Sequence, residues 1–255
     1  VVVMDEKANW CIPILSGHLG GANLLADKLA KMTGAQAAIT TATDVRGVWA
    51  VDSWAKREGL KVINPGKIKE ISAGLLRGQT KKIISEFPIA GKLPTGVVFS
   101  EAASCDIYVG IHRLTDREQE PLYLVPQALC VGIGCRKGAS REQIDALFEK
   151  VMEQNCIWHE AIEMVCSIDL KKEEPGLLDF CAEHFWKLKT YDAETLRNLK
   201  GAFTASTFVK QVTGVDNVCE RSAKKGSGNG KILIPKTAQN GVTIAAAMKT
   251  VEISF

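Results

Sequence analysis

Short apolar runs alternate with amphipathic stretches along most of the chain. Runs of this length, rich in β-branched and aromatic residues, predict strands, and apolar positions spaced three and four apart predict helices. The predicted strands are 1–5, 10–15, 37–41, 60–64, 81–87, 105–112, 129–135, 163–170, 186–191, 231–236 and 241–248. The predicted helices are 22–34, 45–59, 65–78, 140–152, 173–185, 192–199, 204–214 and 218–225.

Helix ends carry recognisable signals in the first half. The first helix places Leu25, Leu29 and Met32 on one apolar face. Thr43 and Asp44 have side chains suited to capping the second helix. In the third helix, Pro65 fits the first helical position, where its missing N–H costs nothing.

The second half contains two capping-box patterns. Ser140 is followed three residues later by Gln143, and Asn217 is followed three residues later by Glu220. The first precedes a strong apolar stripe of Ile144, Leu147, Phe148, Val151 and Met152. The glycine-rich stretch 226–230 is expected to be flexible.

Strands alternating with helices predict an α/β fold with largely parallel sheets flanked by helices. Residues 113–127 combine charges with two prolines, which favours a linker or an edge element. The strand–glycine–helix pattern restarts after them, so we expect two or more lobes. The expected regions are 1–47, the remnant of an N-terminal domain, a middle region 48–127, and a C-terminal α/β domain 128–255.

Composition excludes several classes of protein. The chain has 255 residues, of which 46% are hydrophobic, so disorder is not expected. A net charge of +3 is too small for a dedicated nucleic-acid binder. No apolar run reaches the length of a membrane span and no signal peptide is visible. A first strand that starts at Val1 suggests that sequence upstream is missing.

The eight cysteines are scattered, without a C-x-x-C pair. They favour a reducing, cytoplasmic setting over a disulfide framework. Two Cys-x-x-His spacings, at Cys156–His159 and Cys181–His184, are weak metal patterns, and packing on a helix face explains them better. We therefore expect no metal site.

A glycine-rich loop between a predicted strand and the first helix is the clearest candidate for chemistry. Gly20, Gly21 and Ala22 could present backbone N–H groups to an anion or oxyanion at the helix start. His18 could accept a proton near neutral pH. Asn23 could donate to a ligand or cap the helix. The same glycines also suit a simple strand-to-helix turn.

The second glycine-containing loop, after the predicted strand 129–135, offers Gly134, Arg136 and Lys137. Arg136 could grip a carboxylate with two hydrogen bonds or lie in solvent. Cys135 beside two cations is treated as structural. Glu220 is a secondary candidate beyond its capping role. Lys236 belongs to a basic group with Lys224, Lys225 and Lys231, which could bind an acidic ligand or form a solvated loop.

Several motifs together resemble one family closely. They are LSGHLGGANLLA, ITTATD, VGIGCRKG, SIDLKKEEPGL, TGVDNVCE and GVTIAAAM. In this order they are similar to the cobalamin biosynthesis protein G family, the cobalt-precorrin-5A hydrolases of the anaerobic vitamin B12 route. The resemblance covers essentially the whole chain, and its last segment is similar to a module that occurs alone in the aerobic pathway. The family carries a further stretch before the first strand.

The resemblance implies a substrate and a reaction. Water would open a lactone on a ring-contracted cobalt-tetrapyrrole, and a two-carbon unit would leave as acetaldehyde. Cobalt would then arrive with the substrate, and no protein cofactor is expected. His18 and Asp44 are the candidate catalytic residues. The candidate substrate-binding residues are Gly20, Gly21, Ala22, Asn23, Gly134, Arg136, Lys137, Glu220 and Lys236.

Two other classes of function compete with this one, a tetrapyrrole carrier and a nucleotide-binding protein. A tetrapyrrole-binding or carrier module without hydrolytic activity stays open. A nucleotide-binding protein is disfavoured, because neither dinucleotide nor P-loop glycine motif occurs. Expected partners are the substrate and neighbouring pathway enzymes, without nucleic acid or membrane, and a homodimer is left open.

Overall fold

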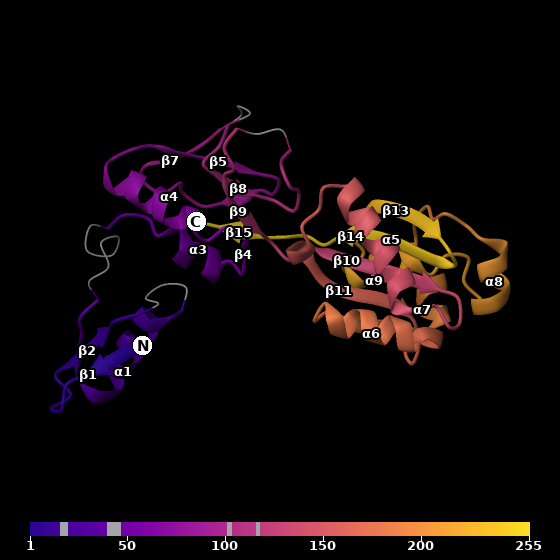
Figure 1. The fold of residues 1–255 in the computed structure, drawn as a ribbon, viewed down its shortest axis with the longest axis horizontal. Helices are drawn as coiled ribbons and strands as arrows, with labels where there is room; N and C mark the ends of the chain where they lie inside the picture. Colours follow the sequence, from indigo (N-terminus) through magenta and orange to yellow (C-terminus); the bar gives the residue numbers. More distant parts are fainter. Residues whose placement is uncertain (16–19, 40–46, 101–103, 116–117) are drawn as a thin grey trace. The chain divides into compact units, whose positions relative to one another are not determined.

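A computed structural model of the chain describes residues 1–15, 20–39, 47–100, 104–115 and 118–255 (Figure 1). The chain folds into two compact units. The first unit combines Val1–Gly110 with Arg117–Val125 and Glu252–Phe255, and the second combines Ile111–Asp116 with Pro126–Val251. The expected α/β class with more than one lobe is confirmed. The division into 1–47, 48–127 and 128–255 stays a prediction.

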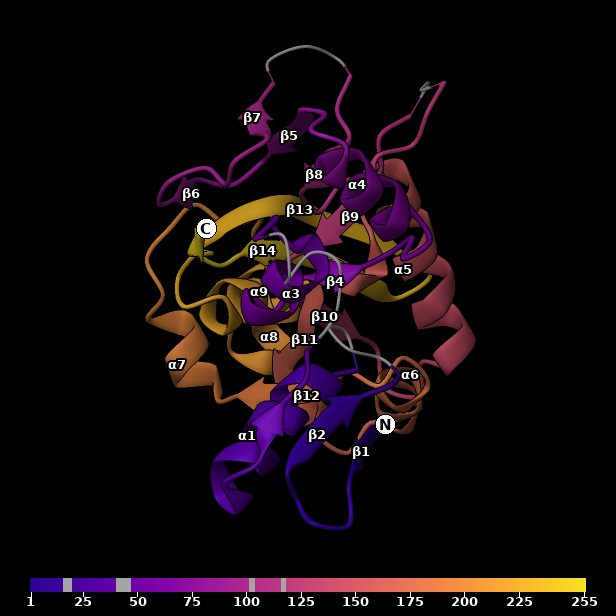
Figure 2. The same ribbon diagram turned by 90° about the vertical axis from the view of Figure 1, so that its left-hand side faces the viewer.

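The first unit begins with a small sheet in the order β1-β2-β3, with α1 on one face (Figure 2). The elements are β1 Val2–Met4, β2 Trp10–Pro13, β3 Gln36–Ala37 and α1 Ala22–Thr33. Helix α1 buries Ala26 and Ala30 against Cys11 of β2. Of the expected apolar face, Leu29 packs against this cluster, but Leu25 is 48% exposed and Met32 is 73% exposed. Small alanines let the helix lie close to a short sheet, and Leu25 and Met32 lie on its exposed side.

The rest of the first unit is built on a sheet in the order β4-β9-β8-β5-β7. All its pairs are parallel except the one between β4 and β9. The strands are β4 Lys61–Val62, β5 Lys81–Ser85, β7 Val97–Phe99, β8 Ile107–Val109 and β9 Leu122–Val125, and the helices are α3 Val51–Arg57 and α4 Lys67–Leu76.

Residues 113–127 are not a simple linker. They contain β9, which lies between two neighbours in the sheet and is buried along its whole length. Pro121 and Pro126 stand just outside the strand, so neither removes a hydrogen bond from its ladder. The prolines that indicated a linker therefore mark the two ends of a core strand.

Two helix starts differ from expectation. The N-cap residue of α3 is Ala50, in place of the expected Thr43 or Asp44, and both of those lie outside the described residues. Helix α4 begins at Lys67 with Gly66 as its N-cap, so Pro65 belongs to the preceding turn. Asn64 is instead used across the sheet, where its side chain accepts a hydrogen bond from the N–H of Tyr123 at 3.0 Å.

The C-terminal residues complete the first unit. Strand β15, Ile253–Ser254, pairs in parallel with β6, Ile89–Ala90. The indole N–H of Trp54 donates to the Ser254 carbonyl at 2.6 Å, and the Trp54 ring stacks on Phe255 with centroids 5.1 Å apart. The unit therefore requires residues some 200 positions apart in the sequence.

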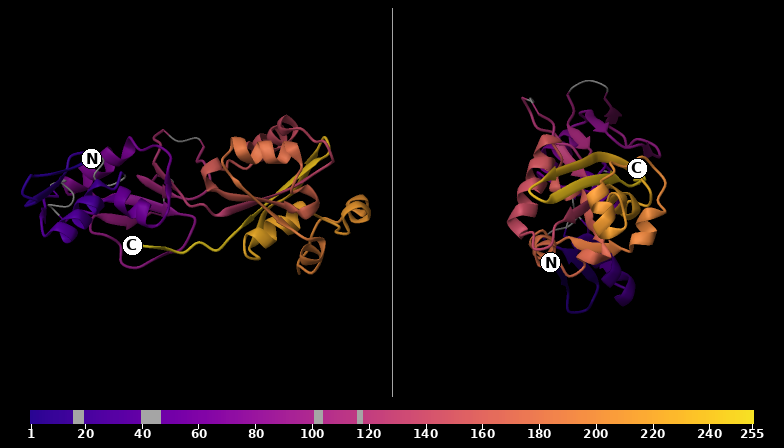
Figure 3. Two further views of the ribbon diagram at one scale, coloured as in Figure 1. Left: turned by 90° about the horizontal axis from the view of Figure 1, so that it is seen from below. Right: turned by 90° about the vertical axis from the view of Figure 1, so that its right-hand side faces the viewer.

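The second unit is a five-stranded sheet in the order β12-β11-β10-β14-β13 with helices on both faces (Figure 3). The pairs β10–β11 and β11–β12 are parallel, and the pairs that join β10, β14 and β13 are antiparallel. Its strands are β10 Leu129–Cys135, β11 Ile162–Ile168, β12 Lys187–Tyr191, β13 Lys231–Gln239 and β14 Val242–Met248.

The helices of this unit are α5 Arg141–Gln154, α6 Pro175–Glu183, α7 Ala193–Arg197, α8 Thr207–Thr213 and α9 Cys219–Gly226, with 3₁₀ turns η1 His159–Ala161 and η2 Asp169–Lys171. The capping box of Ser140 and Gln143 at α5 is confirmed, with both reciprocal hydrogen bonds present. Ile144, Phe148 and the rest of the expected apolar stripe are buried. No helix among the described residues is long and apolar enough to cross a membrane.

The stretch 226–230 contains the end of α9 and a hydrogen-bonded turn, and its expected flexibility stays a prediction. The N–H of Gly230 donates to the Ser227 hydroxyl at 3.1 Å, and the N–H of Asn229 donates to the Lys224 carbonyl at 2.8 Å. A Cβ at Gly230 would lie 1.9 Å from the Met248 carbonyl oxygen, so the turn also packs tightly on β14.

Helix α9 lies directly on β10, because the strand offers glycine at the contact. A Cβ at Gly132 would lie 1.8 Å from the carbonyl oxygen of Cys219 and 2.8 Å from the backbone nitrogen of Ala223. At the other end of the helix, a Cβ at Gly226 would lie 3.3 Å from the Cβ of Cys130, near the start of the strand. The helix therefore runs antiparallel to β10, with its N-terminus near the carboxyl end of the strand.

We predict that Gly132→Ala lowers the free energy of unfolding by about 3 kcal/mol, because the added methyl forces α9 away from the sheet. Gly66→Ala is the matched control, since its Cβ meets no atom within 4 Å. Chemical denaturation measures both. Equal stability of the two variants would contradict the close packing of α9.

Candidate functional site

The carboxyl ends of β10 and β11 lie at the same edge of the second unit's sheet, because the two strands are parallel. The loops that follow them are 136–140 and 169–174, and the N-terminus of α9 lies at the same edge. Ligands of α/β folds bind outside the carboxyl ends of parallel strands. This edge, hereafter the carboxyl edge, is therefore the candidate site in the second unit.

A cleft of about 790 Å³ opens at this edge between the N-termini of α5 and α6. Its lining includes Arg141 and four carboxylates, those of Glu142, Glu174, Asp179 and Glu183. The excess of negative charge makes the cleft a poor place for an acidic ligand. Cations that suit such a ligand lie on the neighbouring loops.

Glu174 holds the two loops together. Its carboxylate accepts the Gly138 N–H at 2.7 Å and pairs with the Lys171 ammonium at 2.6 Å. The hydrogen bond from Lys171 holds the pKa of Glu174 below its ordinary value, with burial opposing it. Neither residue is among the candidates that the sequence predicts. The charged run of SIDLKKEEPGL, directly after a buried strand, was the signal that could have indicated them.

The start of α9 borders the same edge. Gly134 lets the strand pass close to its neighbours, since a Cβ there would lie 2.7 Å from the Thr243 hydroxyl. That hydroxyl donates to the Gly134 carbonyl at 3.1 Å. Cys219 is buried beneath the first turn, and burial raises the pKa of its thiol to about 11. The Cys219 thiol therefore stays protonated near neutral pH and acts as a small apolar side chain in the core.

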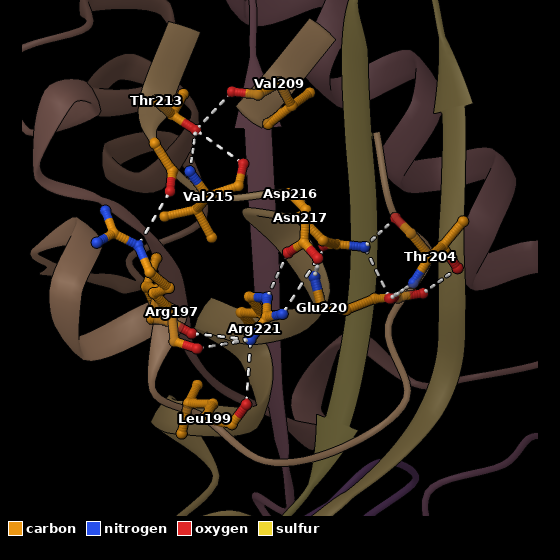
Figure 4. A network of polar contacts seen from close by, with 12 residues as sticks. Arg197, Leu199, Thr204, Val209, Thr213, Val215, Asp216, Asn217, Glu220 and Arg221 are labelled. Atoms are coloured by element: carbon orange, nitrogen blue, oxygen red, sulfur yellow. Dashed lines mark hydrogen bonds and ion pairs between the residues drawn. The ribbon is translucent and has the colours of Figure 1, made fainter. Parts of the chain in front are cut away.

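Glu220 is the centre of a polar network at the start of α9 (Figure 4). Its side chain is almost fully buried, with 3% of the residue exposed. One carboxylate oxygen accepts the Thr204 N–H at 2.7 Å and the Asn217 side-chain amide at 2.7 Å. The other accepts the Thr204 hydroxyl at 2.9 Å and the Lys236 N–H at 2.8 Å. One carboxylate thus fixes three segments of chain.

This network corrects the capping-box prediction for Asn217 and Glu220. The Asn217 side chain does accept the Glu220 N–H at 2.8 Å. The second bond of a capping box, from the Asn217 backbone N–H to the Glu220 carboxylate, is replaced by other contacts of that carboxylate. The Glu220 carboxylate binds the Asn217 side-chain amide, Thr204 and β13. Thr204 carried no sequence signal, because its partner is 16 residues away on another element.

Arg221 stabilises the same region and is not free to bind a ligand. Its guanidinium forms two hydrogen bonds with the Asp216 carboxylate, at 2.8 and 3.3 Å. It also donates to the carbonyls of Leu196 and Leu199, and it lies 4.1 Å from the centre of the Phe203 ring. The hydrogen bond from Arg221 lowers the pKa of Asp216.

The basic group predicted around the turn 226–230 divides between two edges of the sheet. Lys236 lies at the carboxyl edge, bonded through its N–H to Glu220. Lys231 is paired through Met248 to Leu129, at the opposite end of β10. Lys224 and Lys225 are in the last turn of α9, which also lies at that opposite end.

Arg136 and Lys137 follow β10 and are exposed at the carboxyl edge. The N–H of Arg136 donates to the Gly241 carbonyl at 2.8 Å. The structure therefore brings Gly134, Arg136, Lys137, Glu220 and Lys236 to one edge of the second unit. Burial raises the pKa of Cys135, in keeping with a structural thiol.

The remaining predicted residues belong to the first unit. His18 and Asp44 lie outside the described residues. Gly21 is the N-cap of α1 in the left-handed conformation, at φ 74°, and it makes no side-chain capping bond. Asn23 is the second helical residue, so the expectation that it caps the helix is wrong. Gly20 directly precedes this start, and the Ala22 side chain is buried.

The two Cys-x-x-His patterns do not gather into a metal site. In the described part of the chain, no group of three or more His, Cys, Asp or Glu residues could hold a metal ion. His184 bonds the Asp145 carboxylate at 2.8 Å and stacks on Trp186 with ring centroids 4.4 Å apart. Burial raises the pKa of Cys181 to about 12.

Sequence comparison identifies relatives over nearly the whole chain. Residues 1–44 match the family described as Cobalamin synthesis G N-terminal, and residues 129–247 match Cobalamin synthesis G C-terminus. A Salmonella typhimurium protein named cobalt-precorrin-5A hydrolase is 32% identical over 257 residues, which are 96% of this chain and 73% of that protein.

A second protein of that name, from Priestia megaterium, is 28% identical over 266 residues, which are 97% of this chain and 71% of that protein. A third relative matches a shorter part of the chain. The protein CobE of a Sinorhizobium species is 32% identical over 108 residues, which are 42% of this chain and 70% of that protein.

We predict that Arg221→Ala lowers the free energy of unfolding by about 3 kcal/mol at pH 7, because it leaves Asp216 and three carbonyls without their donor. The lowered pKa of Asp216 stabilises the fold above the ordinary pKa of an aspartate, and this stabilisation is lost as the pH falls through the folded pKa. The difference between the variant and the parent should therefore shrink toward pH 3.

Arg197→Ala is the control, since the exposed Arg197 makes a longer bond of 3.3 Å to the Gly214 carbonyl. Its loss should cost about 0.5 kcal/mol. Urea denaturation across this pH range measures both variants. A pH-independent effect of Arg221→Ala would rule out the Asp216 pair as its cause.

Proposed function

Because this chain belongs to the cobalamin synthesis protein G family, we propose that it is a cobalt-precorrin-5A hydrolase of anaerobic cobalamin biosynthesis. Water opens the lactone of the ring-contracted cobalt-tetrapyrrole. A carbon–carbon bond then breaks, and the two-carbon fragment leaves as acetaldehyde, giving cobalt-precorrin-5B. The observation that carries this proposal is 32% identity to a protein of that name across 96% of the chain.

The chemistry requires two proton transfers and an anion site. A base takes a proton from the attacking water, and N–H donors stabilise the oxyanion that forms on the lactone carbonyl. Opening the lactone frees a hydroxyl on the former meso carbon. A base removes the proton of that hydroxyl. The C–O bond then becomes the carbonyl of acetaldehyde as the bond between the former meso carbon and the ring breaks. The conjugated macrocycle takes the electron pair.

We assign water activation to His18, with Asp44 as the second candidate. The N–H groups of Gly20, Gly21 and Ala22 hold the oxyanion, and Asn23 donates to the substrate. The geometry of α1 supports this assignment, since its N-terminus starts at a glycine without a side-chain cap. Unpaired N–H groups at a helix start favour negative charge.

The carboxyl edge of the second unit supplies cations for the acidic side arms of the substrate. Arg136, Lys137 and Lys236 contact its carboxylates, and Gly134 lies beside them near the end of β10. Glu220 serves as a positioning residue, because its carboxylate fixes the backbone of Lys236 and the loop at Thr204. Cobalt is part of the substrate, and the protein needs no cofactor of its own.

The enzyme works in the cytoplasm, where the substrate passes between neighbouring enzymes of the pathway. Nucleic acid and membrane have no part in this function, and a homodimer is compatible with it. A carrier of tetrapyrroles without hydrolytic activity is the second candidate. The exposed cations of Arg136 and Lys137 at the carboxyl edge support it, because they can bind an acidic tetrapyrrole whether or not a reaction follows.

Incubation of the full-length protein with cobalt-precorrin-5A tests the two functions directly. A hydrolase releases acetaldehyde in step with a loss of mass from the tetrapyrrole. A carrier binds the tetrapyrrole and shifts its absorption spectrum, but leaves its mass unchanged. Binding without acetaldehyde would therefore replace the first function with the second.

We predict that the triple variant Arg136→Ala, Lys137→Ala, Lys236→Ala weakens substrate binding by about 10- to 100-fold and flattens its dependence on salt. Each exposed charge contributes up to about 1 kcal/mol, and salt screens it. The matched control is Lys224→Ala, Lys225→Ala, Lys231→Ala, which removes the same charge from the opposite edge. Spectral titration measures both, and equal weakening by the control would remove the carboxyl edge from the binding site.

We predict that His18→Ala keeps the fold and lowers turnover by roughly 10²–10⁴, the usual contribution of a general base. If His18 only holds its loop, the variant should instead lose thermal stability and affinity with little change in the maximal rate. Acetaldehyde release at the full rate by folded His18→Ala would eliminate it as the base. Asp44 would then be tested in the same way.

A further inference from the structure

The sheet of the first unit has a topological switch point between β5 and β8. The chain leaves β5 toward β7 on one side of the sheet, and it leaves β8 toward β9 on the other side. Both strands are parallel neighbours, so their carboxyl ends lie side by side. Open α/β sheets bind ligands outside the carboxyl ends of two such strands.

Glu86 directly follows β5 at this point. Its N–H donates to the Val109 carbonyl of β8 at 2.9 Å, which extends the pairing by one residue. The Ser85 hydroxyl closes a turn over Glu86, accepting from the Phe87 N–H at 3.1 Å and donating to the Phe87 carbonyl at 2.7 Å. The Cα of Glu86 is therefore held in a tight, fixed turn.

The side chain of Glu86 is also held in place, by contacts with Tyr108 and Gly110. The phenol of Tyr108, a residue that is 7% exposed, donates to one carboxylate oxygen at 2.5 Å. The Tyr108 ring is itself held edge-on by Tyr123, with centroids 6.0 Å apart. A Cβ at Gly110 would lie in contact with that same oxygen, so the carboxylate rests over a residue without a side chain.

One carboxylate oxygen is therefore held by a buried phenol, while Glu86 as a residue is exposed. The buried Tyr108 hydroxyl needs one hydrogen-bond acceptor, and a backbone carbonyl or a water molecule could serve. Packing alone therefore does not require a carboxylate at position 86. The arrangement here places an ionisable group at the ligand-binding end of the sheet. Glycine at 110 and tyrosine at 108 both serve that placement.

We propose that Glu86 is the base of the carbon–carbon cleavage step and that Tyr108 is its positioning residue. This inference rests on the function proposed above. After the lactone opens, Glu86 takes the proton of the freed hydroxyl. The O–H electrons form the carbonyl of acetaldehyde, and the electron pair of the broken carbon–carbon bond passes to the macrocycle. Glu86 then returns the proton to the ring carbon, so atoms and charge balance.

The test is a single-turnover reaction of the full-length protein with cobalt-precorrin-5A, followed by mass and by acetaldehyde. With Glu86→Gln, which keeps an oxygen to accept from Tyr108, acetaldehyde release should fall by roughly 10²–10⁴. A species heavier than the substrate by one water should accumulate, because the lactone still opens. His18→Ala should instead leave the substrate unchanged, which separates the two steps.

Two further variants keep the inference falsifiable if Glu86→Gln does not fold. Glu86→Ala should regain part of its acetaldehyde release when formate is added, since a small carboxylate can occupy the space and a structural role would not respond. Tyr108→Phe should lower kcat by about tenfold with little change in KM. Glu70→Gln, an exposed change on α4 of the same unit, is the control and should match the parent.

The outcomes separate this inference from the proposed function. Acetaldehyde at the parental rate from Glu86→Gln, or from Glu86→Ala without any response to formate, would overturn the role of Glu86 while the hydrolase function stands. Absence of acetaldehyde from the parent protein would overturn the proposed function itself. Accumulation of the hydrated species in Glu86→Gln alone would support both.

Discussion

The contact between α9 and β10 determines the geometry of the second unit. Gly132 lets the helix backbone touch the strand, and this fixes the height and direction of α9 over the sheet. The first turn of the helix then lies at the carboxyl edge, where Glu220 is buried. A buried carboxylate is costly unless it is fully hydrogen-bonded, and four donors from three segments satisfy this one.

Two residues at the start of α9 hold neighbouring segments of the chain by hydrogen bonds. Glu220 holds the loop at Thr204 and the backbone of Lys236, while Arg221, one residue on, holds the end of α7 through the Leu196 and Leu199 carbonyls. The helix thus orders segments that have little apolar surface of their own. A loop fixed in this way can present cations to an acidic ligand without losing much conformational freedom on binding.

The first unit uses a different constraint, the return of the C-terminal residues. Ser254 and Phe255 complete a cluster around Trp54 that the preceding residues of the unit cannot close alone. Within its sheet, the chain leaves β5 and β8 in opposite directions, which creates a switch point, and Glu86, Tyr108 and Gly110 lie there. Both features arise from strand order, which no local stretch of sequence encodes.

The sequence by itself determined the α/β class, the apolar stripe of α5 and its capping box, because these depend on neighbours within a few residues. Its motifs were also enough to indicate the family. The tertiary structure decided that 122–125 form a core strand, that alanines rather than Leu25 and Met32 face the sheet from α1, and that Lys224 and Lys236 lie at opposite edges. It also decided that Glu220 bonds to Thr204 and Glu86 to Tyr108. Such pairs join residues 16 and 22 positions apart, and their distance depends on how helices and strands pack, which residue type and spacing do not specify.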